Sequence, residues 1–199
     1  MIAIIDYNIG NIGSVCKAFE RFGHDVRLIN DPRGIAAADK VVLPGVGAFG
    51  DSMGNLSRLG FVTPLREYIA TGKPFLGICV GLQLLLTESE EKGMHPGLNI
   101  IPGQVLRFPE GEKIPQIGWN QVRIVKQGPL FRGIPDNAYF YFVHSFYARP
   151  GSPSDAAGLT AYGVEYASVL QRENIFGVQF HPEKSQKTGL KLIENFCSF

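Results

Sequence analysis

The sequence predicts an α/β protein with a mostly parallel central sheet covered by helices on both faces, and additional antiparallel strands in the C-terminal half. Two patterns predict this fold. Unbroken apolar runs alternate with helical spacing through the first half of the chain, as in strands that are buried on both faces of a parallel sheet. The second half changes to alternating, aromatic-rich segments joined by Gly/Pro turns, which is typical of antiparallel strands.

The first half supplies four strands and the helices between them. The expected strands are Ile2–Ile5, Asp25–Ile29, Lys40–Leu43 and Pro74–Ile78. Helical spacing covers Ile12–Phe22 and Asp51–Ala70, the latter with a break near Gly60, and Val80–Leu86 is expected to start a further helix. Ligands bind outside the carboxyl ends of parallel strands. Three loops should therefore converge there: Tyr7–Gly10, Pro44–Gly47 and the turn at Cys79.

The second half is expected to be richer in strands. They are Gln104–Phe108, Gln116–Val125, Ala138–Ala148 and Ser168–Phe180, and Ser185–Phe196 closes the chain as a helix. Pro150–Ser154 reads as a loop rather than a linker, and no segment repeats. We therefore expect one domain over residues 1–199.

Composition and charge exclude several classes of function. The net charge of +1, with basic and acidic residues intermixed, leaves no basic footprint for nucleic acid or an anionic membrane. Three widely spaced cysteines argue against a disulfide framework and for a reducing compartment. The start, Met1–Asp6, lacks the basic segment of a signal peptide, and no apolar run reaches the roughly 20 residues of a membrane span. We expect a soluble, cytoplasmic protein.

Cys79 lies in the most informative stretch of the chain. Gly77-Ile78-Cys79-Val80-Gly81 joins a buried strand to the start of a helix. Such a turn holds its central residue in a strained conformation and lifts its side chain clear of the sheet. Glycines two residues to either side would let the neighbouring backbone pass without Cβ clashes. The N-terminus of the following helix would favour the thiolate, which is the nucleophilic form of cysteine.

A histidine and a glutamate follow more than a hundred residues later. His181 can act as the base that a cysteine nucleophile needs near neutral pH. Glu183 can hold the imidazole in the right tautomer, and Phe176–Phe180 is the strand expected to deliver both. These residue types predict a cysteine-nucleophile enzyme with Cys79, His181 and Glu183 as its catalytic residues.

These residues also have other interpretations, as core residues or as part of a metal site. A cysteine after an apolar strand is often a core residue. A His-x-Glu pair also occurs in zinc deaminases, but those add a Pro-Cys-x-x-Cys motif, and here Cys16 and Cys197 each stand alone. No metal site is therefore expected. His24 and His95 are expected in turns, without a function.

Attack on an amide carbon creates an oxyanion that needs backbone donors. One would be the N–H of Val80, and the glycines of Gly45-Val46-Gly47 would allow a second peptide to face the site, although an ordinary Gly-rich loop looks the same. It is not a phosphate-binding loop, because no Gly-Lys-Ser/Thr follows. Gln83 either binds a polar substrate or lies on the surface, and His144 either touches the ligand or is a packed histidine.

Over nearly its whole length the chain resembles a known family. Gly-Ile-Cys-Val-Gly-Leu-Gln at 77–83, with a distant His-Pro-Glu at 181–183, is similar to the triad class of glutamine amidotransferases. Those enzymes hydrolyse glutamine to glutamate and pass ammonia to a synthase. Within that class, four stretches resemble the glutaminase subunits of imidazole glycerol phosphate synthases in histidine biosynthesis: Leu43–Phe49, Ile117–Asn120, Tyr141–Ser145 and Gly177–Ser185.

The resemblance implies a role for each matching residue. Cys79 would be the nucleophile, His181 the acid/base and Glu183 its orienting partner. Gly45, Val46 and Gly47 would form the oxyanion strand, and glutamine would be held by Gln83, His144, Ser145 and Phe146. The implied partner is a (β/α)₈-barrel synthase (cyclase) subunit, in a heterodimer without a cofactor, that uses the ammonia to make imidazole glycerol phosphate and AICAR. Its interface would include Asn11, Trp119, Asn120, Tyr141 and Lys184.

Two positions depart from the family pattern. Asn8 stands where glycine is usual, although asparagine tolerates the left-handed conformation, and Phe146 stands where a tyrosine often follows His-Ser. Three alternatives stay open. They are the glutaminase of another amidotransferase (of pyridoxal phosphate or aminobenzoate type), a cysteine hydrolase or protease of similar fold, and a non-catalytic binding module.

Overall fold

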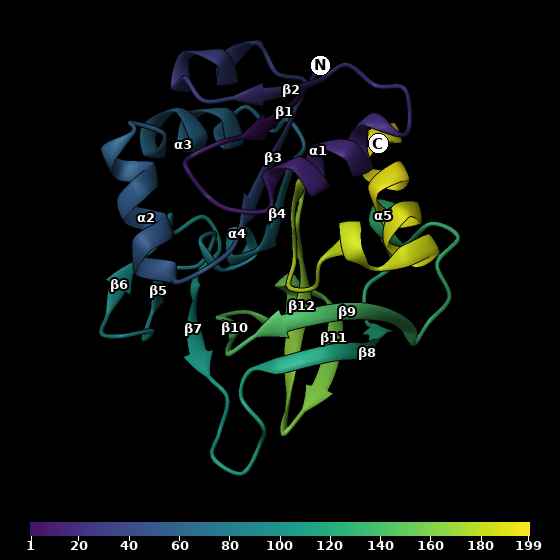
Figure 1. Ribbon diagram of the computed structural model, residues 1–199. Coiled ribbons are helices and arrows are strands. Elements are labelled where there is room, and N and C mark those ends of the chain that lie inside the picture. The colour runs from purple at the N-terminus through teal and green to yellow at the C-terminus, as the bar shows by residue number, and fades with distance from the viewer.

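The computed structural model describes all of residues 1–199, and its 13 strands join into one hydrogen-bonded sheet (Figure 1). Its main path has the order β2-β1-β3-β4-β13-β12-β10-β7-β5-β6. The first five strands of this path pair in parallel: β2 Val26–Ile29, β1 Ile2–Ile5, β3 Lys40–Gly45, β4 Phe75–Cys79 and β13 Ile175–Val178. The four strands predicted in the first half are confirmed, and β3 runs two residues beyond its predicted end, to Gly45.

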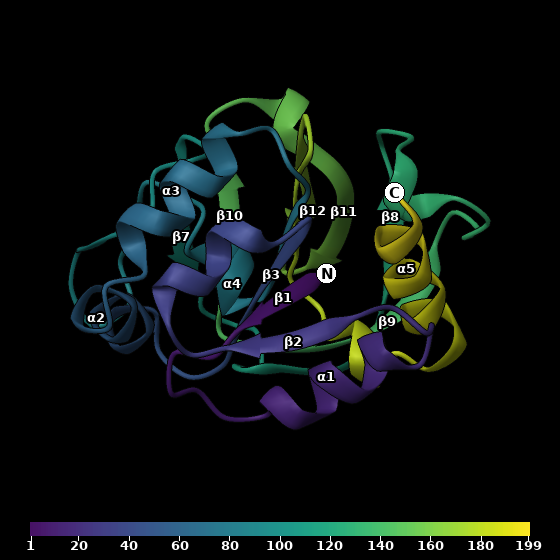
Figure 2. The ribbon, with the colours of Figure 1, turned by 90° about the horizontal axis from the view of Figure 1, so that it is seen from above.

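Helices cover both faces of this parallel part, as predicted (Figure 2). Helices α1 (Ile12–Glu20) and α5 (Gln186–Ser198) lie on one face, where the Phe19 and Phe196 rings meet edge to face. Helices α2 (Phe49–Arg58) and α3 (Val62–Ala70) lie on the other. The predicted break near Gly60 is confirmed, because this residue has a φ of +77° that an L side chain rarely adopts.

Every residue of β1 and β4 is buried, which explains why their sequences are unbroken apolar runs. The buried core is continuous across the two halves of the chain. Within it the fully buried Phe140 and Phe180 rings stack with centroids 3.9 Å apart. No helix is both long enough and apolar enough to cross a membrane.

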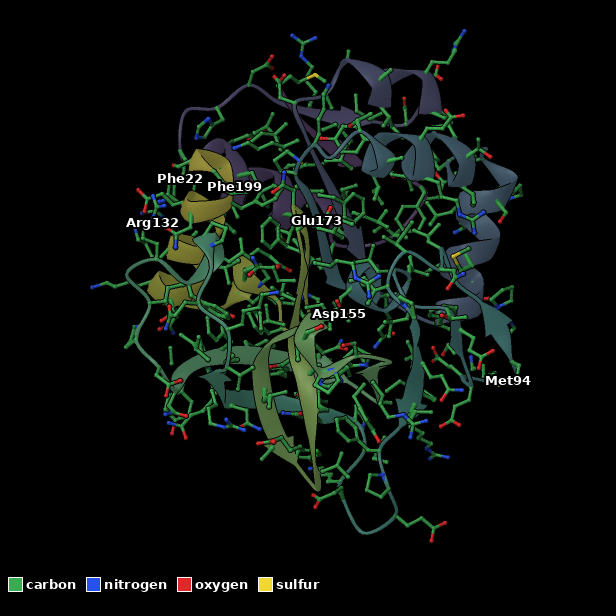
Figure 3. The ribbon with its side chains drawn as sticks, turned by 180° about the vertical axis from the view of Figure 1, so that it is seen from behind. Phe22, Met94, Arg132, Asp155, Glu173 and Phe199 are labelled. Atoms are coloured by element: carbon green, nitrogen blue, oxygen red, sulfur yellow. The ribbon has the colours of Figure 1, made fainter.

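The second half contains more strands than predicted. They are β5 Glu88–Ser89, β6 His95–Pro96, β7 Gly103–Arg107, β8 Gln116–Ile124, β9 Ala138–His144, β10 Phe146–Pro150, β11 Ala156–Tyr162 and β12 Val164–Arg172. Strands β5, β6 and β11 were not predicted, and His95 lies in β6 rather than in a turn. In the view from behind, Met94 marks the outer edge beside β6, and Asp155 marks the start of β11 (Figure 3).

Two predicted strands are each two strands. The prediction for Ala138–Ala148 was wrong because the chain bends at Ser145, so that β9 pairs with β8 while β10 pairs with β7 and β12. The prediction for Ser168–Phe180 was wrong because the chain reverses at Glu173, whose φ is +51°. After that turn β13 runs antiparallel to β12 but parallel to β4, and so extends the parallel part.

The helix predicted at Val80–Leu86 is also shorter than expected. Helix α4 comprises only Val80–Gln83, about one turn. Its free N–H groups still follow Cys79, but so short a helix has a much smaller dipole than the sequence suggested.

Candidate active site

The sheet register places the carboxyl end of β4 at the centre of the site. Cys79, the last residue of β4, is the register partner of Gly45 at the end of β3. On the other side, the pairing of Val178 with Ile78 brings Gln179 next to Cys79. The loop after β1 joins them, because the Tyr7 hydroxyl donates a hydrogen bond of 2.8 Å to the carbonyl of Pro44. The predicted convergence of the three loops is confirmed.

Cys79 has the strained backbone that the sequence predicted, with φ +55° and ψ −111°. The flanking glycines are needed for close packing. A Cβ on Gly77 would lie 2.4 Å from the carbonyl oxygen of Gly81, and one on Gly81 would lie 1.8 Å from that of Leu43. The expectation that these glycines let the neighbouring backbone pass is confirmed.

His181 lies beside Cys79, and Glu183 contacts the other side of the imidazole, in the order expected from the sequence. His181 follows β13, and its Nδ1 lies 2.9 Å from Oε1 of Glu183, whose side chain is fully buried. The backbone of this segment is tied to β9, since the N–H of His181 donates to the carbonyl of Tyr141. The Ser185 hydroxyl in turn donates to the carbonyl of His181.

The surroundings of His181 favour its protonated form. Burial works against the charge, but the hydrogen bonds and charges of Cys79 and Glu183 outweigh it and raise the pKa of the imidazole to about 10. A histidine held as imidazolium beside a cysteine is the arrangement that supports a thiolate nucleophile.

A cavity of about 320 Å³ opens over Cys79. Most of the predicted site residues line it, namely Val46, Gly47, Val80, Gln83, His144, Ser145, Phe146, His181 and Lys184. Gly45 does not line it and instead, with Val46, lines a small neighbouring pocket that His181 also lines. Glu91, Pro115 and Val143 also line the cavity and were not predicted.

Glu91 is the one carboxylate among the lining residues, and sequence reasoning missed it. Its Oε2 accepts a hydrogen bond of 2.7 Å from the backbone N–H of Phe49 at the start of α2. Within the polar run Glu88–Lys92 it has the appearance of a solvated surface residue. No local signal distinguishes it, because only the fold carries this segment to the cavity.

His144 and Gln83 are both buried rather than exposed. His144 Nδ1 lies 2.8 Å from the carbonyl oxygen of Phe146, and Nε2 lies 3.1 Å from the hydroxyl of Tyr166. Burial lowers the pKa of His144 to about 4, so its ring is neutral near pH 7. Gln83 donates to the same carbonyl of Phe146 at 3.0 Å. The backbone carbonyl of Phe146 therefore holds both side chains in this wall of the cavity. The tyrosine hydroxyl that is common in the family at position 146 is not needed for these two contacts.

The residues expected at a partner interface lie in two places. Trp119 and Tyr141 are register partners on β8 and β9, with ring centroids 5.9 Å apart, and the indole is 45% exposed. Asn120 instead donates to the carbonyl of Ala161 in β11. Lys184 is exposed at the cavity, while Asn11 donates to Oε1 of Glu183.

Asn8 has a φ of +65°, so the turn that usually contains glycine is kept.

Comparisons with known proteins give matches over nearly the whole chain. The family described as "Glutamine amidotransferase class-I" matches residues 3–198. The imidazole glycerol phosphate synthase subunit HisH of Moorella thermoacetica is 54% identical over 98% of this chain and 93% of its own length. The HisH 1 subunit of Methanococcus maripaludis is 51% identical over 98% of both chains.

Solved structures share the fold at lower identity. PurLQS from Thermotoga maritima superposes with a TM-score of 0.78 at 16% identity, over 99% of this chain and 97% of the other. A glutamine amidotransferase from the same organism gives a TM-score of 0.68 at 22% identity, over 99% of this chain and 82% of the other. These neighbours share the α/β architecture with its mixed sheet.

Proposed function

Because the chain belongs to the class-I glutamine amidotransferases, and within them to the HisH subunits of imidazole glycerol phosphate synthases, we propose that it hydrolyses glutamine with Cys79, His181 and Glu183. The ammonia is delivered to a (β/α)₈-barrel cyclase subunit that makes imidazole glycerol phosphate and AICAR. The observation that supports this most is the strained Cys79 at the base of a cavity, beside the buried His181–Glu183 pair.

In the first half of the reaction, the Cys79 thiolate attacks the side-chain amide carbon of glutamine and forms a C–S bond. The negative charge moves to the amide oxygen, where the backbone N–H of Val80 and the peptide between Gly45 and Gly47 act as donors. The imidazolium of His181 gives its proton to the amide nitrogen. The C–N bond then breaks, ammonia leaves, and a thioester remains on Cys79.

In the second half, neutral His181 takes a proton from water as that water attacks the thioester carbon. The C–S bond breaks, glutamate leaves, and the thiolate–imidazolium pair is restored. Glu183 stabilises the imidazolium each time it forms, because its Oε1 faces Nδ1 at 2.9 Å.

The cavity suits the two charged ends of an amino acid. The Glu91 carboxylate would bind the α-ammonium group of glutamine. Backbone groups of His144–Phe146 would bind its α-carboxylate, and the amide of Gln83 would contact the substrate beside them. The neutral state of His144 agrees with a packing and positioning role in this wall.

The partner would bind where the cavity meets β8 and β9. The side chains of Ile117, Trp119 and Tyr139 on these strands are all more than 40% exposed, and aromatic residues are enriched at protein interfaces. Asn120 and Tyr141 belong to the same two strands, while Asn11 and Lys184 would extend the interface to Glu183 and to the cavity. A peptide between Gly45 and Gly47 is the candidate switch of the glutaminase rate. If this peptide rotates so that its N–H no longer faces the site, one oxyanion donor is lost, which costs roughly 10²–10³ in rate. We place the complex in the cytoplasm, with the whole chain acting as one domain.

A glutamine-like alkylating analogue tests this proposal. In the complex with the cyclase subunit, the analogue should label Cys79 and spare Cys16 and Cys197, and glutamine should protect against it. Cys16 is the natural control, because it is more exposed than Cys79. Inactivation with the label on another cysteine would refute the assignment.

A further inference from the structure

A buried amide on the far side of Cys79 from Gly45 has no part in the mechanism above. We propose that the side chain of Gln179 is a second hydrogen-bond donor to the Cys79 sulfur, beside His181, and that Gln83 holds it in this orientation. Gln179 would thus stabilise the thiolate directly. This inference rests on the proposed role of Cys79 as the nucleophile.

The sheet places Gln179 at the sulfur. Val178 in β13 is the register partner of Ile78 in β4, so the next residue of each strand, Gln179 and Cys79, are neighbours. Gln179 Nε2 lies 3.8 Å from Cys79 Sγ, within the longer range of hydrogen bonds to sulfur. The Gln179 side chain is fully buried. A buried amide needs partners for its polar atoms, and this sulfur is one of them.

The direction of this hydrogen bond follows from the neighbouring groups. A backbone carbonyl can only accept, so the atom of Gln83 that faces the Phe146 carbonyl at 3.0 Å must be its NH₂ group. The same NH₂ group lies 3.2 Å from the Gln179 side chain, which must therefore present its carbonyl oxygen there. The remaining end of the Gln179 amide, its NH₂ group, is then the end that faces Cys79.

The sulfur also has an acceptor within reach. The carbonyl oxygen of Val143 lies 4.0 Å from Cys79 Sγ, and only a protonated thiol can donate to it. Gln179, in contrast, donates to the sulfur, and hydrogen bonds from neutral donors to an ionised acceptor are stronger than those to a neutral one. The Gln179 donor therefore stabilises the thiolate, while the Val143 carbonyl stabilises only the protonated thiol.

Other charged or titratable groups also face this sulfur or its cavity and influence its protonation. A test of Gln179 must therefore leave these residues unmutated. They are His181 with Glu183 on its far side, the buried Tyr7 near Cys79, and His144, Glu91 and Lys184 around the cavity. None of them is altered by a substitution at position 179.

The test is the pH dependence of Cys79 alkylation by iodoacetamide in the folded, full-length chain, followed by mass spectrometry of the Cys79 peptide. Gln179→Met keeps the length and volume of the side chain but removes the donor. We expect the midpoint of its pH–rate profile to move up by about one unit, which makes alkylation about tenfold slower at pH values below both midpoints. An unchanged midpoint in folded Gln179→Met overturns the proposal.

Two further variants separate this effect from general damage. Asn195→Leu also removes a buried amide, one that donates to the carbonyls of Leu130 and Arg132, and should leave the midpoint unchanged. If Gln179→Met does not fold, Gln83→Met decides, because without Gln83 the Gln179 amide loses its anchor and the midpoint should again rise. Iodoacetamide alkylates the sulfur by displacement of iodide and lacks the α-ammonium and α-carboxylate groups of glutamine, so the midpoint reports the thiolate whether or not glutamine is the substrate.

Discussion

The Asn11 side-chain amide donates a hydrogen bond of 2.9 Å to Oε1 of Glu183, the same carboxylate oxygen that faces Nδ1 of His181 at 2.9 Å. Residues from opposite ends of the chain thus meet at one oxygen atom. Asn11 precedes α1 and itself has a left-handed conformation, with φ +65°. Because Asn11 is one of the residues proposed to contact the partner, this single hydrogen bond would link that contact to the carboxylate beside His181.

Replacing Asn11 with alanine should lower the glutaminase rate of the cyclase-bound chain by about tenfold. The lost hydrogen bond is to a charged group, and such bonds contribute about 1.5–3 kcal/mol. Rates should be measured at saturating cyclase, so that weaker binding does not account for the loss. Ser14→Ala, on the exposed side of α1, is the control and should be unaffected. An Asn11→Ala enzyme with full activity would show that Glu183 needs no further support.

Replacing Glu183 with glutamine should move the alkaline limb of the kcat–pH profile to lower pH. The pKa of His181 is raised to about 10, so its imidazolium persists as pH rises towards that value. Without the Glu183 charge only the contact with Cys79 raises this pKa, so the pKa falls and the imidazolium is lost at a lower pH. NMR titration of His181 in both proteins measures the change. His181→Ala should cost more activity, about 10²–10⁴-fold, and the reverse order would contradict the assigned roles.

His144 should make the protein less stable as the pH falls from 6.5 to 4. Its folded-state pKa is lowered to about 4, mainly by burial, so below pH 6.5 the unfolded chain takes up a proton that the folded chain does not. The stabilisation of wild type relative to His144→Gln should therefore shrink by about 3 kcal/mol over this range. Urea unfolding at a series of pH values measures it. A constant difference would mean that His144 titrates normally.

Gly81→Ala should destabilise the fold by about 3 kcal/mol or more, because the new methyl group would meet the carbonyl oxygen of Leu43. Gly54→Ala is the matched control. A methyl group there meets nothing within 4 Å, and alanine is favoured over glycine in a helix by about 1 kcal/mol. Thermal unfolding should therefore shift in opposite directions in the two variants. Equal shifts would contradict the close approach of these backbones.

The sequence predicts best where local pattern and burial agree. Strands β1 and β4 are apolar because both faces are covered, and the glycines around Cys79 signal a close backbone approach that the structure contains. The parallel pairing of β13 with β4 was missed because the turn at Glu173 was not recognised, so the four apolar residues of β13 were included in one long antiparallel strand. Glu91 was missed because it lies in a polar run with the pattern of a solvated surface, and only the fold carries this segment between β5 and β6 to the cavity. Gln179 acquires its meaning only from the register between β13 and β4.

The central claim is that Cys79 carries out a glutaminase reaction under the control of the cyclase subunit. The most direct measurement is the steady-state rate of glutamate formation from glutamine by the chain alone, with the cyclase, and with the cyclase and its ribonucleotide ligand. We predict a nearly silent lone chain and a rise of roughly 10²-fold or more in the occupied complex, the size expected when an oxyanion donor is restored, with no activity for Cys79→Ala. Full activity of the lone chain, or glutamate formation by the Cys79→Ala complex, would contradict this account.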